Sequence, residues 1–117
     1  MATTLPLVRG TLDLLVLRAL RWEPTHGAGV ASWIRYVTAG AIEVDEGSLY
    51  PALHRLEQRG LIASEWGRSE HNRRARTYQV TAEGRDFFWA EQERWERYKE
   101  VVDRVLRYGT AGGILGR

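Results

Sequence analysis

The sequence predicts a mainly α-helical protein with a small β-hairpin, set between three N-terminal helices and one long C-terminal helix. Three observations carry this prediction. Apolar residues recur with helical spacing in three segments before residue 60, branched and aromatic residues then gather in two short runs, and helical spacing returns after residue 81. A chain of 117 residues has room for one domain with a real core.

Apolar spacing predicts the first two helices. Between Arg9 and Trp22, apolar residues recur at intervals of three and four, and Leu14 and Leu17 add apolar surface beside that stripe. A helix with two apolar faces packs on two sides. After a break that contains one proline and two glycines, a shorter helix is expected over Val30–Val37.

A third helix is expected over residues 47–59, with Gly60 as its stop. Its inner stripe is formed by Leu49, Leu53 and Leu56. A rotation of 100° per residue then turns a polar set outward, with Ser48 and Tyr50 on its flanks. The outward residues are Pro51, His54, Arg55 and Gln58.

Residues 61–66 and 74–80 predict a β-hairpin, and residues 67–73 between them predict a long polar tip. Positive charge concentrates here. Between His54 and Arg76 there are six arginines and three glutamates, a net charge of +3, whereas the whole chain carries only +2. Such a cluster suits contact with phosphates or a minor groove.

The last predicted helix begins after Thr81, a good N-cap, and extends to about Tyr108. Phe88, Trp95 and Val102 are seven residues apart, and Tyr98 and Val105 occupy the adjoining heptad position. An apolar seam of this kind requires a partner helix. The last residues, 109–117, contain four glycines and are expected to be flexible.

Composition excludes several classes of function. The absence of cysteine excludes a disulfide framework, a zinc–thiolate site and a cysteine nucleophile. With three histidines and no glycine-rich phosphate loop, no residues converge on catalysis, so we expect neither an enzyme nor a bound metal or cofactor. The longest apolar run is interrupted by Arg18 and is too short to span a membrane, and we expect a cytoplasmic protein.

The order of these elements matches a winged helix-turn-helix followed by a dimerisation helix. The DNA major groove admits one helix, and Arg55 is the best candidate for base recognition because a guanidinium can bind guanine through two hydrogen bonds. A plain solvated helix face and a merely solvated tip are the alternatives. We divide the chain into an N-terminal arm (1–8), a winged helix-turn-helix (9–80), a dimerisation helix (81–108) and a tail (109–117).

Several stretches closely resemble the PadR family of bacterial transcriptional regulators, and the run from Glu46 is the most specific. The resemblance spans about Arg9 to Arg107, and a single helix after the hairpin is similar to the small subgroup of that family. Where relatives usually have Tyr, this chain has Ala28. The matching stretches are GTLDLLVLRAL from Gly10, HGAG from His26, EGSLYPALHRLEQRGLI from Glu46, SEWG from Ser64, NRRARTY from Asn72 and VTAEG from Val80.

The resemblance implies a homodimer that binds duplex operator DNA, commonly as a repressor. By position, the residues near DNA are Ser48, Tyr50, Pro51, His54, Arg55, Asn72, Arg73, Arg74 and Arg76. In relatives the first and last helices build the dimer interface. The residues expected there are Leu14, Leu17, Phe88, Trp95, Tyr98, Val102 and Val105.

Some roles stay open. Some relatives bind small aromatic effectors near the dimer interface, which makes Trp95 a candidate contact, with simple packing in the dimer seam as its alternative. Tyr50 packing on the hairpin and Asn72 shaping its turn are alternatives to DNA contact. Trp22, Trp33 and Trp66 are expected in the core or against turns. A ligand-sensing or protein-interaction module without DNA binding is the alternative function.

Overall fold

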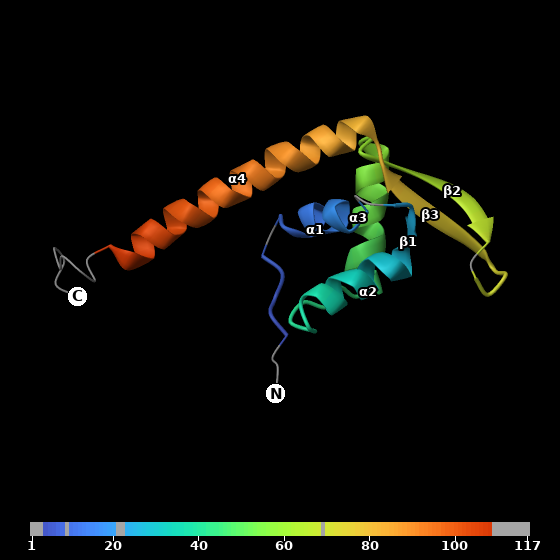
Figure 1. The fold of residues 1–117 in the computed structure, drawn as a ribbon, viewed down its shortest axis with the longest axis horizontal. Coiled ribbons are helices and arrows are strands. Elements are labelled where there is room, and N and C mark those ends of the chain that lie inside the picture. The colour runs from blue at the N-terminus through green and yellow to red at the C-terminus, as the bar shows by residue number, and fades with distance from the viewer. Residues whose placement is uncertain (1–3, 9, 21–22, 69, 109–117) are drawn as a thin grey trace.

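The computed structural model describes residues 4–8, 10–20, 23–68 and 70–108 (Figure 1). It is a mainly helical fold with one small antiparallel sheet. Along the chain its elements are α1 (Leu12–Leu20), β1 (Thr25–His26), α2 (Gly27–Val37), α3 (Glu46–Gln58), β2 (Ile62–Arg68), β3 (Arg74–Val80) and α4 (Ala82–Arg107).

The bounds of α2 and α3 follow from their caps. Helix α2 begins at Gly27, three residues before the predicted start, because the preceding His26 is held in extended backbone by its strand pairing. Helix α3 begins at Glu46, one residue early, because the carboxylate of Asp45 accepts a hydrogen bond of 2.8 Å from the Ser48 N–H. The predicted ends of the first helix, at Arg9 and Trp22, lie outside the described residues.

The sheet has strand order β1–β3–β2, with antiparallel pairing throughout. Strand β1 was not expected from the sequence. Its two residues pair with Tyr78 and Thr77, which are more than fifty positions away, so no local pattern could reveal it. Strand β2 extends to Arg68, opposite Arg74, which leaves a shorter tip than predicted.

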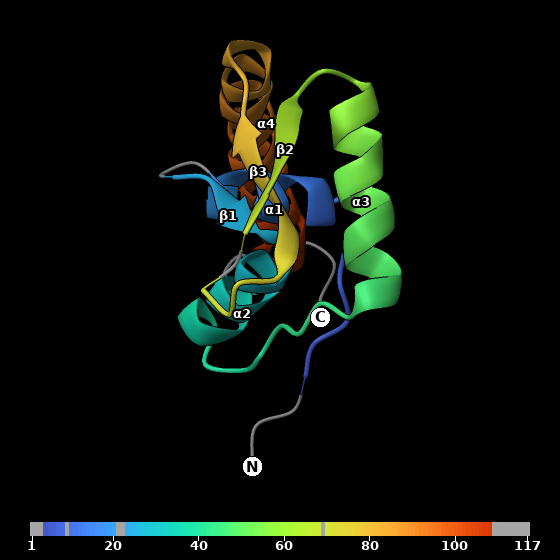
Figure 2. The same cartoon turned by 90° about the vertical axis from the view of Figure 1, so that its right-hand side faces the viewer.

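The core lies between the helices and the inner face of the sheet. Helix α1 is at its centre and contacts α2, α3, α4 and β3. Figure 2 shows α3 on one side of the β2–β3 hairpin, with α1 behind them. Buried side chains from all these elements meet there, including Val16, Leu20, Val30, Ile34, Leu49, Leu53, Leu56, Ile62 and Tyr78.

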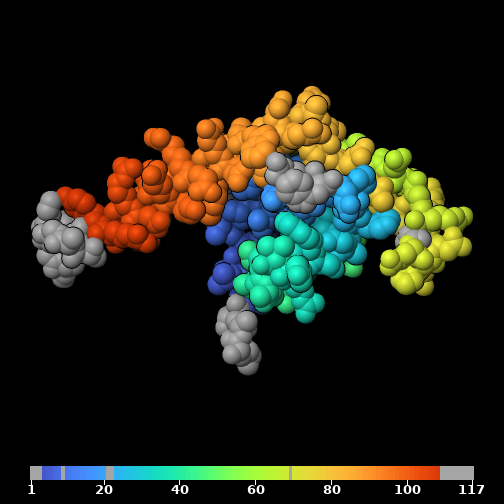
Figure 3. Space-filling model, in the orientation of Figure 1, coloured from blue at the N-terminus to red at the C-terminus, as the bar shows by residue number. Residues whose placement is uncertain are grey.

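Helix α4 starts in the core and then leaves it. The Thr81 hydroxyl caps α4 as predicted, accepting a hydrogen bond of 3.0 Å from the Gly84 N–H. Gly84 is buried against the backbone of Leu61, where a side chain would not fit. The C-terminal half of α4 projects past the body of the molecule (Figures 1 and 3). Among the described residues, no helix is both long and apolar enough to cross a membrane.

Candidate nucleic-acid interface

The outer surface of α3 carries most of the polar residues that the sequence placed there. Four of the predicted DNA-contact residues on this helix are exposed, and Ser48 is half-buried beside the N-cap. The opposite stripe of the helix is buried in the core. The exposed candidates are Tyr50, Pro51, His54 and Arg55.

Arg55 is not free on this surface. Its guanidinium donates to the carboxylate of Asp13 on α1 at 2.9 Å, an ion pair that joins residues 42 positions apart. The pair occupies one of the five guanidinium N–H donors, so Arg55 retains others. Arg59 lies instead over the Phe87 ring of α4, 4.7 Å from its centroid, and so is engaged at the far end of the helix. Asp13 was missed because helical spacing says nothing about long-range partners.

Trp66 organises the arginines of the hairpin. It is 54% exposed, so the expectation that it lies in the core or against a turn was wrong. Its cross-strand partner is Arg76, and Arg74 lies diagonally on the same face. The guanidinium carbons of Arg74 and Arg76 lie 4.3 and 5.3 Å from the indole centroid. Cation–π contact therefore holds two positive charges on one face of the hairpin.

A carboxylate joins this hairpin to α3. Glu57 accepts a hydrogen bond from the Ser64 hydroxyl of β2, and the same oxygen lies 3.7 Å from the Arg76 guanidinium. The contact fixes the hairpin relative to α3 and offsets part of the charge of Arg76. Arg74 lies nearer the tip and is exposed.

Asn72 shapes the tip. Its φ of 59° is in the left-handed region, which asparagine tolerates better than most residues. Its carbonyl accepts a hydrogen bond of 3.3 Å from Arg68. Turn formation therefore accounts for Asn72 without a DNA contact. Arg68, which belongs to the predicted basic tip but not to the predicted DNA contacts, joins Arg73 among the exposed arginines near the tip.

Tyr50 packs against the start of α2. A Cβ at Gly27 would lie 2.9 Å from its ring and 3.0 Å from its hydroxyl, so a larger residue at position 27 would displace this ring. Tyr78 lies nearby in β3. Burial raises the pKa of the Tyr78 hydroxyl; Arg76 acts in the opposite direction, and Glu57 and Tyr50 raise it further. The hydroxyl is consequently neutral and able to donate at neutral pH.

A separate groove lies between α1 and α4. It has a volume of about 790 Å³, and its apolar lining includes Leu14, Trp95, Tyr98 and Val101. Farther along α4, no other element packs over the apolar residues of the described chain, and Val105 is 70% exposed. The apolar seam is therefore buried by the protomer's own core at its start and uncovered at its end.

The prediction that Leu17 and Phe88 lie in the dimer interface was wrong. They are 1% and 3% exposed and belong to the protomer's core, so they have almost no surface left for a partner. A heptad spacing indicates that an apolar residue is covered, but it does not say whether its own chain or another covers it. Trp33 packs against the core as expected, and Trp22 lies outside the described residues.

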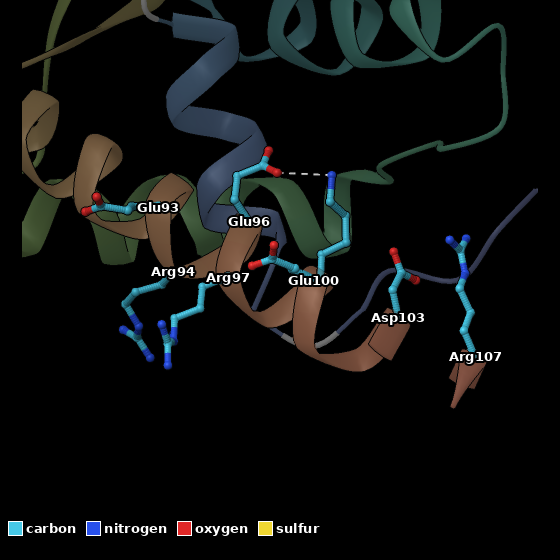
Figure 4. A pocket seen from close by; sticks show the side chains of 8 residues that line it. Glu93, Arg94, Glu96, Arg97, Glu100, Asp103 and Arg107 are labelled. Carbon is cyan, nitrogen blue, oxygen red and sulfur yellow. Dashed lines mark ion pairs between the residues drawn. The ribbon is translucent and has the colours of Figure 1, made fainter. Parts of the chain in front are cut away.

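The remaining face of α4 is charged. Figure 4 shows acidic and basic side chains mixed along it. Lys99 and Glu96 form an ion pair of 3.1 Å. A second pair joins Arg94 and Glu91 at 2.9 Å. The hollow of about 910 Å³ along this face is lined by one helix and by charged side chains alone, which is typical of a solvated surface. Among the described residues, no cluster of His, Asp and Glu is placed to hold a metal ion.

The chain is similar to known transcriptional regulators. Residues 16–90 match the model of the "Transcriptional regulator PadR-like family". A solved transcriptional regulator from Clostridium thermocellum is 32% identical with a TM-score of 0.76, covering 82% of this chain and 93% of its own. A PadR family regulator from Eggerthella lenta is also 32% identical, covering 86% and 85%, with a TM-score of 0.72. One from Clostridium difficile is 29% identical, covering 83% and 99%, with a TM-score of 0.72.

Proposed function

Because the chain belongs to the PadR-like family of transcriptional regulators, we propose that it binds a specific operator sequence through α3 and the β2–β3 hairpin. The observation that carries this proposal is the position of the Trp66–Arg74–Arg76 cluster beside the exposed face of α3. Arginines on the hairpin suit contact with the DNA backbone, and α3 is the element that would enter the major groove. Members of this family regulate transcription and are not enzymes.

Arg55 and His54 are the proposed base contacts, with Ser48, Tyr50 and Pro51 nearer the backbone. The ion pair between Arg55 and Asp13 gives α1 a part in recognition, because a guanine has to compete with a carboxylate for the guanidinium. Such competition favours a DNA sequence whose hydrogen bonds to Arg55 compensate for the broken ion pair over sequences that offer no such hydrogen bonds. On the hairpin, Arg73, Arg74 and Arg76 are the proposed phosphate contacts.

We propose that the protein acts as a homodimer in which the groove between α1 and α4 receives the partner's α4. The apolar residues left uncovered on α4 support this assembly, since a monomer would leave them in water. The revised interface consists of Leu14, Trp95, Tyr98, Val102 and Val105. Two recognition helices at a fixed spacing would then bind two half-sites.

Repression, and release by a small aromatic effector, are the finer parts of the proposal. The family resemblance is what supports repression, and a reporter gene behind the selected operator tests it. The groove that contains Trp95 supports an effector site. Quenching of tryptophan fluorescence by an aromatic ligand would support an effector site if the quenching is lost in Trp95→Phe. If no compound in a panel of phenolic and planar aromatic molecules quenches the fluorescence, Trp95 is better explained by simple packing in the dimer.

The direct test is selection of bound sequences from random duplex DNA, followed by titration of the enriched duplex and an unrelated one. Arg55→Ala is expected to reduce the ratio between the Kd values of the unrelated and the enriched duplex. Arg74→Ala is expected to weaken both and to lower the dependence of log Kd on log salt by about one unit. If wild-type protein enriches no sequence and binds no duplex, the chain is better explained as a winged-helix interaction module.

A further inference from the structure

The end of α3 closes in a way that leaves two carbonyl groups for another element. The Gly60 N–H donates a hydrogen bond of 3.0 Å to the carbonyl of Glu57. The Leu61 N–H donates one of the same length to the carbonyl of Leu56. With a φ of 75° at Gly60, in the left-handed region, this pair of bonds is a Schellman motif. The carbonyls of Gly60 and Leu61 themselves take their partners from beyond α3.

Thr81, the N-cap residue of α4, binds both of these carbonyls. Its hydroxyl donates a hydrogen bond of 2.7 Å to the Gly60 carbonyl, and its N–H donates one of 3.1 Å to the Leu61 carbonyl. The same hydroxyl accepts the bond of 3.0 Å from the Gly84 N–H that caps α4. One oxygen atom therefore serves two helix ends, as a donor to the closing turn of α3 and as an acceptor at the start of α4.

Two further contacts reinforce this joint between α3 and α4. Arg59, the C-cap residue of α3, lies over the Phe87 ring in the second turn of α4, 4.7 Å from its centroid. Gly84 packs against the backbone of Leu61. Beyond these turns, α4 runs away from the body of the molecule (Figure 1). The proposed recognition helix is thus tied to the base of the proposed dimerisation helix by hydrogen bonds, a ring contact and close packing.

We propose that Thr81 is a positioning residue for operator binding, because its hydroxyl fixes α3 relative to α4. This inference rests on the proposed function, which places α3 in the major groove and α4 in the dimer interface. In such a dimer, the separation of the two α3 helices depends on how each α3 joins its own α4. A rigid joint orders both helices before binding, so the second half-site is bound without a further loss of conformational freedom. Thr81 acts through α3 and makes no contact with DNA itself.

Two substitutions separate the two roles of the hydroxyl. Thr81→Ser keeps an oxygen that both donates and accepts. Thr81→Asp keeps a good N-cap for α4, but a carboxylate only accepts, so the bond to the Gly60 carbonyl is lost. Ala82→Asp is the matched control, since it adds the same charge at an exposed position one residue away. Phe87→Leu loosens the joint without a change of charge, because it removes the ring beneath Arg59 and keeps an apolar side chain.

Binding is measured by fluorescence anisotropy on three duplexes: the enriched duplex, one of its half-sites alone, and the enriched duplex with one base pair inserted between its half-sites. Thr81→Asp is expected to bind the enriched duplex about tenfold more weakly than Ala82→Asp does, and the single half-site equally well. Its discrimination against the inserted base pair should also fall, because a loosened joint lets α3 follow the displaced half-site. Phe87→Leu should show the same pattern more weakly, and Thr81→Ser should bind like the wild type.

The half-site separates a loosened joint from a loss of folding, since an unfolded protein would lose the half-site as well as the enriched duplex. If Thr81→Asp and Ala82→Asp bind all three duplexes alike, the positioning role is overturned and the proposed function stands. The same conclusion holds if Thr81→Asp weakens binding to the half-site and to the enriched duplex equally. If the wild type binds no duplex, or binds the enriched duplex no more tightly than its half-site, the proposed dimeric DNA binding fails and this inference fails with it.

Discussion

Alanine at position 84 is expected to disrupt the joint between α4 and the rest of the domain. Gly84 lies in the first turn of α4, packed against the backbone of Leu61. A Cβ built there overlaps the Leu61 carbonyl oxygen and lies 2.8 Å from its carbon and 2.9 Å from Cγ1 of Val80. Relief of this overlap requires a backbone movement on the order of 1 Å in a close-packed interior.

That movement also disturbs hydrogen bonds. The Leu61 carbonyl accepts a bond of 3.1 Å from the Thr81 N–H, and Thr81 in turn caps α4. Overpacking costs about 1–3 kcal/mol, loss of a hydrogen bond costs about 0.5–1.5 kcal/mol, and the helix propensity of alanine offsets about 1 kcal/mol. Because the overlap is with backbone, the upper part of these ranges applies. We expect Gly84→Ala to lower the free energy of unfolding by about 2–3.5 kcal/mol.

Urea unfolding followed by circular dichroism measures this change, at one protein concentration for all variants because the proposed dimerisation would affect apparent stability. Gly47→Ala is the matched control. It also lies in a first helical turn, but its new Cβ would meet only Asp45 Oδ1 at 3.4 Å, so we expect it to be neutral or stabilising by up to about 1 kcal/mol. Equal stability of Gly84→Ala and the wild type would refute the packing argument.

The remaining predictions concern charge and assembly. Val105→Asp should give a monomer by light scattering with the fold retained, and an intact dimer would remove this part of α4 from the interface. The pKa of Tyr78 is raised in the folded protein, so the unfolded chain loses this proton first as the pH rises. The free energy of unfolding should therefore not depend on Tyr78 below about pH 10 and should fall above it. Tyr78→Phe should lack this fall in stability, and Tyr36→Phe, at a highly exposed tyrosine, should keep it. Asp13→Asn should strengthen binding to unrelated DNA several-fold, because it releases Arg55 from its ion pair. It should lower the free energy of unfolding by no more than about 1 kcal/mol. Unchanged binding would mean that the ion pair does not restrain Arg55.

Elements with strong local signals were predicted well. The Thr81 cap and the apolar spacing after it placed α4 within a residue of both ends, and the leucine stripe located α3 equally closely. These signals act between residues three or four positions apart, which the sequence displays directly. The family match confirms the winged-helix fold that they suggested.

The errors involve partners that are distant in sequence. The pairing of β1 with β3, the ion pair of Arg55 with Asp13 and the cover over Phe88 all depend on tertiary packing. Trp66 shows a different limit. Large aromatic residues are usually buried, but at a hairpin flanked by arginines the ring serves better as a platform for cations than as part of a core.

The tight packing at Gly84 makes α4 a lever. With 26 residues at 1.5 Å per residue, the helix is about 39 Å long. A tilt of roughly 10° about its first turn would shift the far end by about 7 Å, close to the axial rise of two base pairs. In the proposed homodimer, small changes in how two α4 helices cross would therefore become large changes in the span between the two α3 helices. Operator spacing in such a protein would be adjusted through residues that lie far from any base.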